Sequence, residues 1–336
     1  MAVARGPSQA LRTLRPDLIR TIGIAITAAV LFGCSSTSGG KTATDQDGNP
    51  VDWIGPTETV PYDPNITKDD RKTGEVLADI ARKLRLWSGI VLEGRASKDA
   101  SRLDLVESSL RYEASKNIAI LVEQLEVGPP TNRQIAAAGL GFSESTEALG
   151  PLMAALDDPS SEVVANALLG LSTLRDAETP VAPIAAKLGD ALASIPVRSN
   201  AGRALRALNL TELGESDRDA IIDAARTALG DDDSALRVHG ALVLAQVGDS
   251  DSVGRIARYL GDESQIVVRA VSRSLARLGS IDDAQFGRAV RALVAAMTGT
   301  DDDTIREAIL DDLQALTKIN YGDDEEEWIK YAQKLP

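Results

Sequence analysis

The sequence of 336 residues contains only one histidine, His239, and only one cysteine, Cys34. One cysteine excludes an intrachain disulfide and a cysteine cluster for a metal ion, and one histidine excludes a paired-histidine metal site. A Ser-His-Asp arrangement would have to use His239, and the G-x-S-x-G, Walker and G-x-G-x-x-G motifs are all missing. We therefore expect no enzyme, and hence no catalytic residues, no metal site and no cofactor.

His239 follows Val238 within a predicted helix. It stands away from the apolar stripe that its neighbours form at helical spacing. We expect a solvated histidine on the surface.

Aromatic residues make up only 3% of the chain and hydrophobic residues 43%, and no segment alternates convincingly as a strand. This profile is typical of a helical array rich in alanine and leucine.

An excess of positive charge is also missing. The net charge is −14, and the first 33 residues carry four arginines and one aspartate, so removing their +3 leaves −17. We expect no nonspecific binding to nucleic acid, because phosphate neutralisation dominates such affinity.

The stretch from Asp231 to Gly279 contains one pattern twice: an acidic turn followed by small and apolar residues at helical spacing. Such a unit cannot bury its apolar stripe alone, so it needs neighbours stacked on it. The leucine that closes each stripe recurs after 31 residues (171 − 140) to 39 residues (244 − 205). The six closing leucines are Leu140, Leu171, Leu205, Leu244, Leu275 and Leu313.

A hydrophobic residue and an arginine precede several of these leucines, as in Val197-Arg198, Leu236-Arg237 and Ile305-Arg306. Together with the acidic turn, the small central residue and the closing leucine, these pairs resemble HEAT repeats, particularly the short bacterial kind grouped with phycobilisome lyases. The resemblance covers roughly residues 110–320, and two repeats depart from it: the first has Asn132 before Arg133, and the fifth has Val268 where an arginine would stand. It implies an all-α fold, a right-handed α-solenoid of stacked HEAT-like helix pairs.

The N-terminus has the pattern of an export signal. Four arginines precede an apolar run from Ile22 to Phe32 that is too short to span a bilayer comfortably. The segment Leu31-Phe32-Gly33-Cys34 resembles the lipobox of bacterial lipoproteins, in which the cysteine accepts diacylglycerol and a palmitate-type acyl chain. We predict lipid attachment at Cys34 and a location on the cell membrane or outer membrane, facing the periplasm or cell exterior. The alternatives are a secretory signal cut near Gly33 and a short membrane anchor.

Composition and helical periodicity predict the remaining boundaries. We expect a signal peptide (1–33), a flexible tether (34–70), an N-terminal helical cap (71–127), HEAT-like repeats (128–320) and a C-terminal capping helix (321–336).

The N-terminal cap is predicted to contain a helix at 74–93 and a second at 100–126 that breaks near Tyr112. Trp87 could be an aromatic binding residue, but core packing explains it better. At the other end, Asp323 to Lys334 has acids first and lysines later, as the helix dipole favours. The two acidic triplets of the repeats, Asp231–Asp233 and Asp301–Asp303, could bind a cation, although helix N-capping explains them adequately.

Arginines that belong to no buried stripe gather in the second helices of the repeats. Spaced four apart, Arg269, Arg273 and Arg277 share one face of a helix. Arg203 holds the place in the third repeat that Arg273 holds in the fifth, and Arg206 lies one turn further on. Because the resemblance puts second helices on the concave side, these arginines could form a groove for an acidic protein segment, with bidentate contacts to carboxylates. Alternatively, they pair with acids of adjacent helices.

Solenoids present long continuous surfaces, which suit partners larger than metabolites. We therefore expect a membrane-anchored lipoprotein that acts as a protein-binding scaffold or assembly factor in the cell envelope, with another protein as partner and no small-molecule substrate. The alternatives are an enzyme-like or chaperone-type protein related to the lyases and a purely structural envelope protein. The export signal and the missing histidines and cysteines argue against the lyase-like alternative.

Overall fold

The computed structural model describes residues 68–92 and 100–336, all within the second of two units of the chain, residues 41–336. Cys34, the predicted signal and nearly all of the predicted tether lie outside the described residues. The described residues form helices and turns and contain no strand. The helices are α1 (Lys68–Leu92), α2 (Ala100–Lys116), α3 (Ile118–Val127), α4 (Pro130–Leu140), α5 (Leu149–Ala154), α6 (Ser161–Leu174), α7 (Val181–Gly189), α8 (Ile195–Ala207), α9 (Glu215–Leu229), α10 (Ser234–Val247), α11 (Val253–Ile256), α12 (Gln265–Ile281), α13 (Asp283–Gly299), α14 (Asp303–Thr317) and α15 (Glu325–Lys334).

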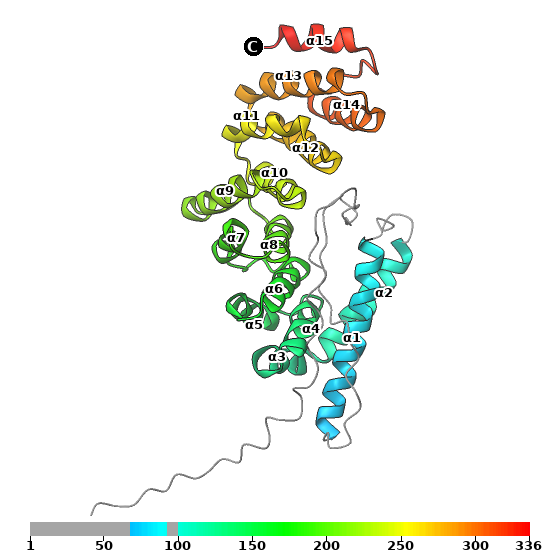
Figure 1. The fold of residues 1–336 in the computed structure, drawn as a ribbon, viewed down its shortest axis with the longest axis vertical. Coiled ribbons are helices and arrows are strands. Elements are labelled where there is room, and N and C mark those ends of the chain that lie inside the picture. Colours follow the sequence, from blue (N-terminus) through cyan, green and yellow to red (C-terminus); the bar gives the residue numbers. More distant parts are fainter. Residues whose placement is uncertain (1–67, 93–99) are drawn as a thin grey trace, which may run out of the picture. The chain divides into compact units, whose positions relative to one another are not determined.

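From α3 onward the helices stack as antiparallel pairs in two layers (Figure 1). The second helices of the pairs, α4, α6, α8, α10, α12 and α14, pack on one another in chain order and form what we call the second-helix layer. The first helices, α3, α5, α7, α9, α11 and α13, form the first-helix layer, and α15 packs on α13. Several first helices are short: α11 continues into a 3₁₀ turn, Ala257–Gly261. This is an all-α repeat solenoid, and that part of the sequence prediction is confirmed.

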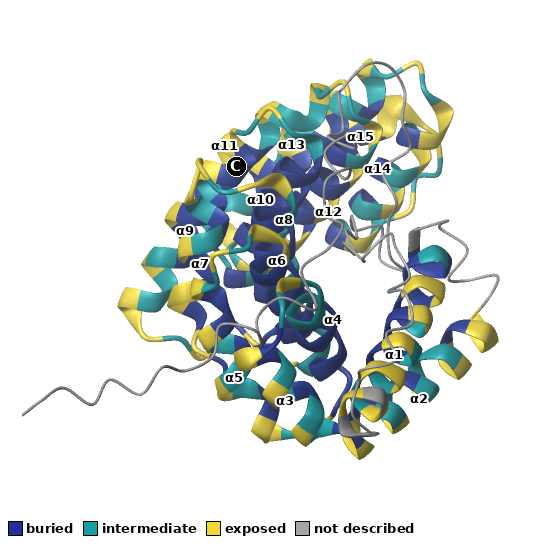
Figure 2. Ribbon diagram, turned by 60° about the horizontal axis from the view of Figure 1, so that its bottom comes forward, coloured by how far each residue is buried: buried dark blue, intermediate teal, exposed yellow. Residues whose placement is uncertain are grey.

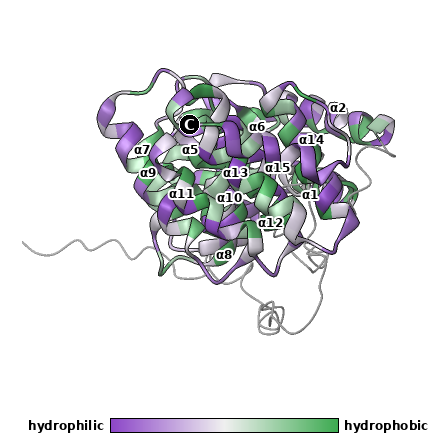
Figure 3. Cartoon of the chain, turned by 90° about the horizontal axis from the view of Figure 1, so that it is seen from above, coloured by the Kyte–Doolittle hydropathy of each residue, from purple (hydrophilic) through white to green (hydrophobic). Residues whose placement is uncertain are grey.

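The closing leucines mark the core of each repeat. All six have no exposed surface, and their neighbours at helical spacing are buried with them. Buried residues form a continuous band between the layers (Figure 2), while hydrophilic residues gather at the turns (Figure 3). The predicted register of the repeats is therefore confirmed. Because each repeat buries its stripe on the next, one apolar core runs through the stack.

An aspartate of each acidic triplet caps the N-terminus of a second helix. The Asp233 side chain accepts hydrogen bonds from the backbone N–H groups of Ala235 and Leu236, at 2.9 and 3.2 Å. Asp302 does the same for α14, accepting from Thr304 and Ile305. These are the orphan donors of a helix N-terminus. The N-capping interpretation is confirmed, and no group of three acids, histidines or cysteines in the described ranges is arranged to hold a metal ion.

Three arginines of the repeat frame, Arg133, Arg198 and Arg237, connect neighbouring repeats, and we call them the bridging arginines. Arg237 donates two hydrogen bonds to the carboxylate of Asp262 in the next repeat, at 2.7 and 2.8 Å. Arg133 pairs with Asp158 in the same bidentate way, at 2.7 and 3.0 Å.

Arg198 makes the equivalent bridge through one nitrogen, which lies 2.6 Å from Asp231. Arg237 also donates to the carbonyls of Asp231 and Asp232 in the turn before its own helix, and Arg133 to that of Gly128, whereas Arg198 donates to the carbonyl of Leu188 in the last turn of α7. One guanidinium thus joins two successive turns.

The N-terminal helices differ from the prediction at two boundaries, and the first is the start of α1, which lies at Lys68 rather than at residue 74. The break after α2 falls at Asn117 rather than near Tyr112. The Asn117 amide donates to the carbonyl of Glu113, four residues earlier, so this side chain competes with the helical backbone at that point. Trp87 is buried, donates to Glu107 at 3.0 Å and meets Phe142 edge to face, which confirms its core role.

The C-terminal helix α15 closes the stack through Trp328. This ring has no exposed surface and meets Tyr321 and Tyr331 edge to face. Its indole N–H donates to the carbonyl of Gly322, where φ is +58°, so a turn and the helix that follows it are tied together. None of the described helices is both long enough and apolar enough to cross a bilayer.

The prediction for His239 is wrong, because this residue is fully buried. Helix α10 packs against α8, α9 and α12, so every residue from Ala235 to Ala241 is covered and the helix has no solvated face there. The imidazole lies against Gly202 of α8: a Cβ on that glycine would stand 2.6 Å from the Cβ of His239. The same place, five residues before the closing leucine, holds buried Asn166 and Asn200 in the two preceding repeats.

Burial, followed by the charges of Arg206 and Arg203, holds the pKa of His239 well below its ordinary value of 6.5. Neither ring nitrogen has a hydrogen-bond partner in the described structure. The folded chain therefore keeps this histidine neutral, whereas the unfolded chain protonates it near its ordinary pKa.

The buried leucines give a first test of the repeat register. Leu244→Ala leaves a cavity in a core that cannot fully collapse, and we expect it to lower the free energy of unfolding by about 2–5 kcal/mol. Thermal or urea unfolding measures the change. Leu192→Ala is the control, because Leu192 is 96% exposed and its loss should change stability little. Equal stability of the two variants would contradict the register.

His239 predicts a pH dependence of stability. Below about pH 6.5 the unfolded chain gains a proton that the folded chain does not take up, so stability should fall with pH at up to about 1.4 kcal/mol per pH unit. Above that pH both states are neutral at this position and the contribution is flat. Urea unfolding between pH 8 and pH 5 measures the slope.

The matched control is His239→Asn, the residue that two other repeats carry at this place. It should remove the part of the slope between pH 6.5 and pH 5. The chain has no other histidine, so wild type and variant with the same slope in that range would refute the assignment.

Candidate partner-binding surface

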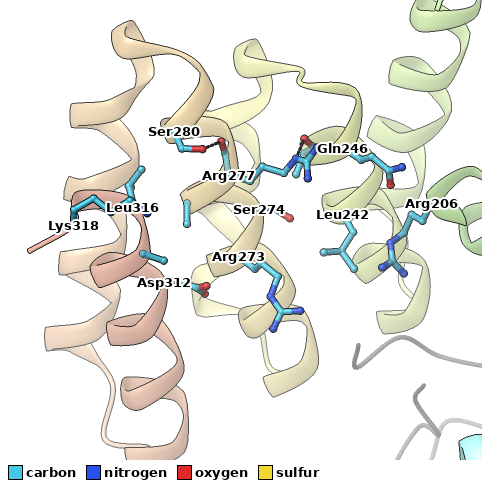
Figure 4. A pocket seen from close by; sticks show the side chains of 13 residues that line it. Arg206, Leu242, Gln246, Arg273, Ser274, Arg277, Ser280, Asp312, Leu316 and Lys318 are labelled. Carbon is cyan, nitrogen blue, oxygen red and sulfur yellow. Dashed lines mark hydrogen bonds between the residues drawn. The ribbon is translucent and has the colours of Figure 1, made fainter. Parts of the chain in front are cut away.

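A hollow of about 480 Å³ lies over the second-helix layer and crosses four successive repeats (Figure 4). Helices α8, α10, α12 and α14 all contribute to its lining, each through its C-terminal half. Its surface combines cations, small polar groups and apolar side chains. The lining residues are Arg206, Leu242, Ala245, Gln246, Arg273, Ser274, Ala276, Arg277, Ser280, Asp312, Ala315, Leu316 and Lys318.

The structure brings three of the five predicted arginines to this hollow: Arg206, Arg273 and Arg277. Arg269 is exposed on α12, one turn before Arg273, and does not line the hollow. Arg203 is half-buried on α8 near the buried His239, and it does not line the hollow either. The predicted strip therefore divides into a group of three at the hollow and two residues outside it.

Arg277 is fixed in place by the neighbouring repeat. Its Nε donates to the backbone carbonyl of Ala245 in α10 at 2.9 Å. Gln246 reaches in the same direction, and its amide donates to the carbonyl of Leu208 at 2.7 Å, one repeat earlier. Both bonds satisfy carbonyls in the last turns of helices, which have no partner within the helix. The outer nitrogens of Arg277 stay at the hollow.

One carboxylate, Asp312, belongs to the hollow. The hydroxyl of Ser272 donates to it at 2.6 Å. Burial raises the pKa of Asp312, while the Ser272 hydrogen bond and the positive charges of Arg273 and Arg269 act in the opposite direction. The acid thus offsets part of the arginine charge on α12.

Ion pairs with acids of the next repeat, which the alternative prediction expects of the arginine strip, are made by the bridging arginines. Arg133 and Arg237 are largely buried, and each has an aspartate of the next repeat as partner. Within the described ranges, Arg269 and Arg277 are exposed and make no ion pair with a carboxylate. The bridging arginines are therefore buried and paired with acids, whereas Arg269 and Arg277 are exposed to solvent.

Several lining residues were not predicted. Leu242 and Leu316 supply apolar surface, and Gln246, Ser274 and Ser280 supply polar groups, whereas the predicted surface consisted of arginines alone. Lys318 follows α14 in the left-handed conformation, with φ of 61°. A helical wheel places Leu242 and Gln246 on one face of α10, but it does not show that two other helices meet that face.

Comparisons with known proteins bear on the fold. Residues 221–316 match the family model of HEAT repeats, whereas no curated protein matches the chain in sequence. A designed armadillo repeat protein is 20% identical, with a TM-score of 0.45 and coverage of 59% of this chain and 98% of that one. The complex of CpcE and CpcF of phycocyanin lyase from Nostoc is 15% identical, with a TM-score of 0.40 and coverage of 85% and 100%. Human deoxyhypusine hydroxylase is 19% identical, with a TM-score of 0.34 and coverage of 76% and 93%.

At these identities the likeness to solved structures concerns the fold alone. The family match covers the fourth to sixth helix pairs, from α9 to α14, which include three of the four helices that line the hollow. The described part of the chain is an all-α repeat solenoid, and its residues 221–316 match HEAT repeats.

Proposed function

We propose that this chain is a protein-binding scaffold or assembly factor of the cell envelope, anchored by lipid at Cys34, and that it holds its partner on the second-helix layer. The observation that carries the proposal is the hollow: three arginines and a lysine from three different repeats meet there with one acid. The chain as a whole has a net charge of −14, so this local excess of cations has the opposite sign to the molecule.

A solenoid suits this role because its surface is built from repeated, similarly oriented helices. A partner that crosses several repeats gains a small contribution from each, and specificity comes from the few side chains that differ between repeats. The hollow has this form, since single residues such as Arg206 and pairs such as Arg273 and Arg277 come from different helices.

The envelope location rests on the N-terminal sequence. Basic residues, a short apolar run and the segment Leu31-Phe32-Gly33-Cys34 have the order that lipoprotein export requires. Several acyl chains at one cysteine would anchor the chain stably, whereas a single chain binds a membrane only marginally. The acidic solenoid adds no attraction to anionic headgroups, so lipid would supply the anchoring.

Lipidation is tested at the mature N-terminus. We expect mass spectrometry to find a chain that begins at Cys34 and carries diacylglycerol, and Cys34→Ser to release the protein from the membrane fraction. A mature chain that begins elsewhere, or at an unmodified Cys34, would disprove the anchor and leave the binding surface to be tested separately.

Charge reversal at the hollow tests the binding surface. Arg273→Glu together with Arg277→Glu should abolish capture of a stoichiometric envelope partner in a pull-down, because two attractive contacts become repulsive. Exposed charges contribute about 0–1 kcal/mol each to stability, so the melting temperature should change little.

The matched control is Arg255→Glu with Arg258→Glu, which makes the same charge change at exposed positions of the first-helix layer. This variant should still capture the partner. If capture survives reversal at the hollow, or is lost equally in both variants, the binding surface lies elsewhere.

A further inference from the structure

The junction between the third and fourth repeats contains buried polar atoms that lack partners. Arg198 bridges to Asp231 through one nitrogen, and its Nη2 has no hydrogen-bond partner in the described structure. The hydroxyl of Ser199 and both ring nitrogens of His239 are buried there without a partner as well. Each of these atoms has lost water and gained no hydrogen bond, which makes the closed junction less stable than a fully paired one.

Helical spacing places Ser199 at the contact of α8 with α10. Gly202 and Arg206 follow it by three and seven residues, so all three share one face of α8. This face meets α10, because a Cβ on Gly202 would stand 2.6 Å from the Cβ of His239. The hydroxyl of Ser199 and the imidazole of His239 therefore belong to the same helix contact.

The junctions on either side are better paired. One repeat earlier, the place of His239 holds Asn200, whose amide donates to the carbonyl of Ala165 in α6 at 2.9 Å. One repeat later, Arg237 bridges to Asp262 through two hydrogen bonds. Neighbouring repeats of a solenoid are held together by their own shared contacts, so we expect the junction between α8 and α10 to open before these two.

A proton on His239 would meet positive charge. The charged groups that act on the ring are Arg206 and Arg203 of α8. Helices α8, α10 and α12 contain no aspartate or glutamate at all. Helix α9 does contain acids, but the residues that it packs on α10 beside His239 are Ala225 and Leu229.

The charges of the other two helices against α10 do not change this balance. Helix α12 adds only positive charge, from three arginines, and one of them, Arg277, reaches α10 at Ala245, more than one turn beyond His239. The acids of α9 are exposed or half-exposed: Glu215, Asp217, Asp219 and Asp223. In the described structure the closed junction therefore offers an imidazolium no acid as a partner.

We propose that the contact of α8 with α10 is a pH-sensitive joint, which opens on acidification while the repeats on either side stay folded. An opened contact hydrates His239, which can then take up a proton near pH 6.5, whereas the closed contact keeps the ring neutral. The equilibrium constant for opening should therefore rise about tenfold between pH 7.5 and pH 5.5. Urea unfolding reports on the whole chain, whereas this inference specifies where the chain opens first.

Opening the joint would also divide the hollow. Arg206 lies on the α8 side of the joint, whereas the other lining residues lie on α10, α12 and α14 or directly after α14. The hydrogen bond from Gln246 to the carbonyl of Leu208 crosses the joint as well. Acidification would then weaken binding of a partner at the hollow. This consequence rests on the proposed function, whereas the joint itself does not.

The test measures how fast a buried thiol reacts when the chain opens. Ser199→Cys places the thiol in the joint without removing a hydrogen bond, and Cys34→Ser makes it the only thiol of the purified chain. Ser172→Cys in α6 and Ser274→Cys in α12 are the matched controls, because both hydroxyls are buried in repeats on either side. The reagent is 4,4′-dithiodipyridine, which also reacts in mild acid.

Each labelling rate is divided by the rate of the same variant unfolded in urea at the same pH, which removes the effect of pH on the thiol itself. At pH 5.5 we expect this ratio to be at least about tenfold higher for Ser199→Cys than for either control, because the joint opens without the rest of the chain. Between pH 7.5 and pH 5.5 the ratio for Ser199→Cys should rise about tenfold.

Adding His239→Asn should abolish that rise, because the asparagine cannot take up a proton, even if it changes the level of the ratio. Helical content is checked for each variant, and His239→Gln replaces His239→Asn if the latter fails to fold. Equal ratios at the three sites would show that the chain opens as a whole and would overturn the joint. A ratio for Ser199→Cys that is independent of pH, or that rises equally with asparagine at position 239, would overturn its pH sensitivity. The labelling needs no partner, so its outcome is independent of the proposed function.

Discussion

The ion pair between a bridging arginine and an aspartate of the next repeat fixes the stacking at three of the junctions between repeats. Arg237 and Asp262 are both largely buried and meet through two hydrogen bonds, while the same guanidinium holds two carbonyls of its own turn. Bidentate geometry fixes orientation as well as distance. Because a buried charge left without its partner costs about 3–5 kcal/mol, loss of either member of such a pair would destabilise its junction.

The second and fifth repeats differ from this arrangement, the second because Val164 stands at the place of the bridging arginine. Val268 stands where a bridging arginine would be, and the connection from α12 to α14 is made by smaller groups: Gln265 bonds to Asp302 and Ser272 to Asp312. The hollow has its largest share of lining residues on this helix, α12. Arg273 and Arg277 of α12 lie at exposed positions where a partner could reach them.

The two sets of arginines thus have different roles in the structure. Those of the repeat frame are enclosed by neighbouring turns and stabilise the stack, whereas Arg273 and Arg277 lie over the surface of the second-helix layer. The stack places the second helices side by side, and this brings residues of α8, α10, α12 and α14 to one hollow. Stability and the proposed recognition of a partner are linked through that geometry.

Periodicity in the sequence was enough to determine the helical class, the repeat length and the buried leucines, because a 3.6-residue stripe must face a neighbour whatever that neighbour is. Periodicity did not predict the features that depend on contacts with several neighbouring helices. His239 is buried because α10 is covered by three helices, and the break at Asn117 depends on one side chain bonding to the backbone. Arg237 and Asp262 are 25 residues apart in the chain, and the hollow needs side chains from four helices. Only the tertiary structure decides such contacts, because their partners are set by how the repeats stack and not by the residues next to them in sequence.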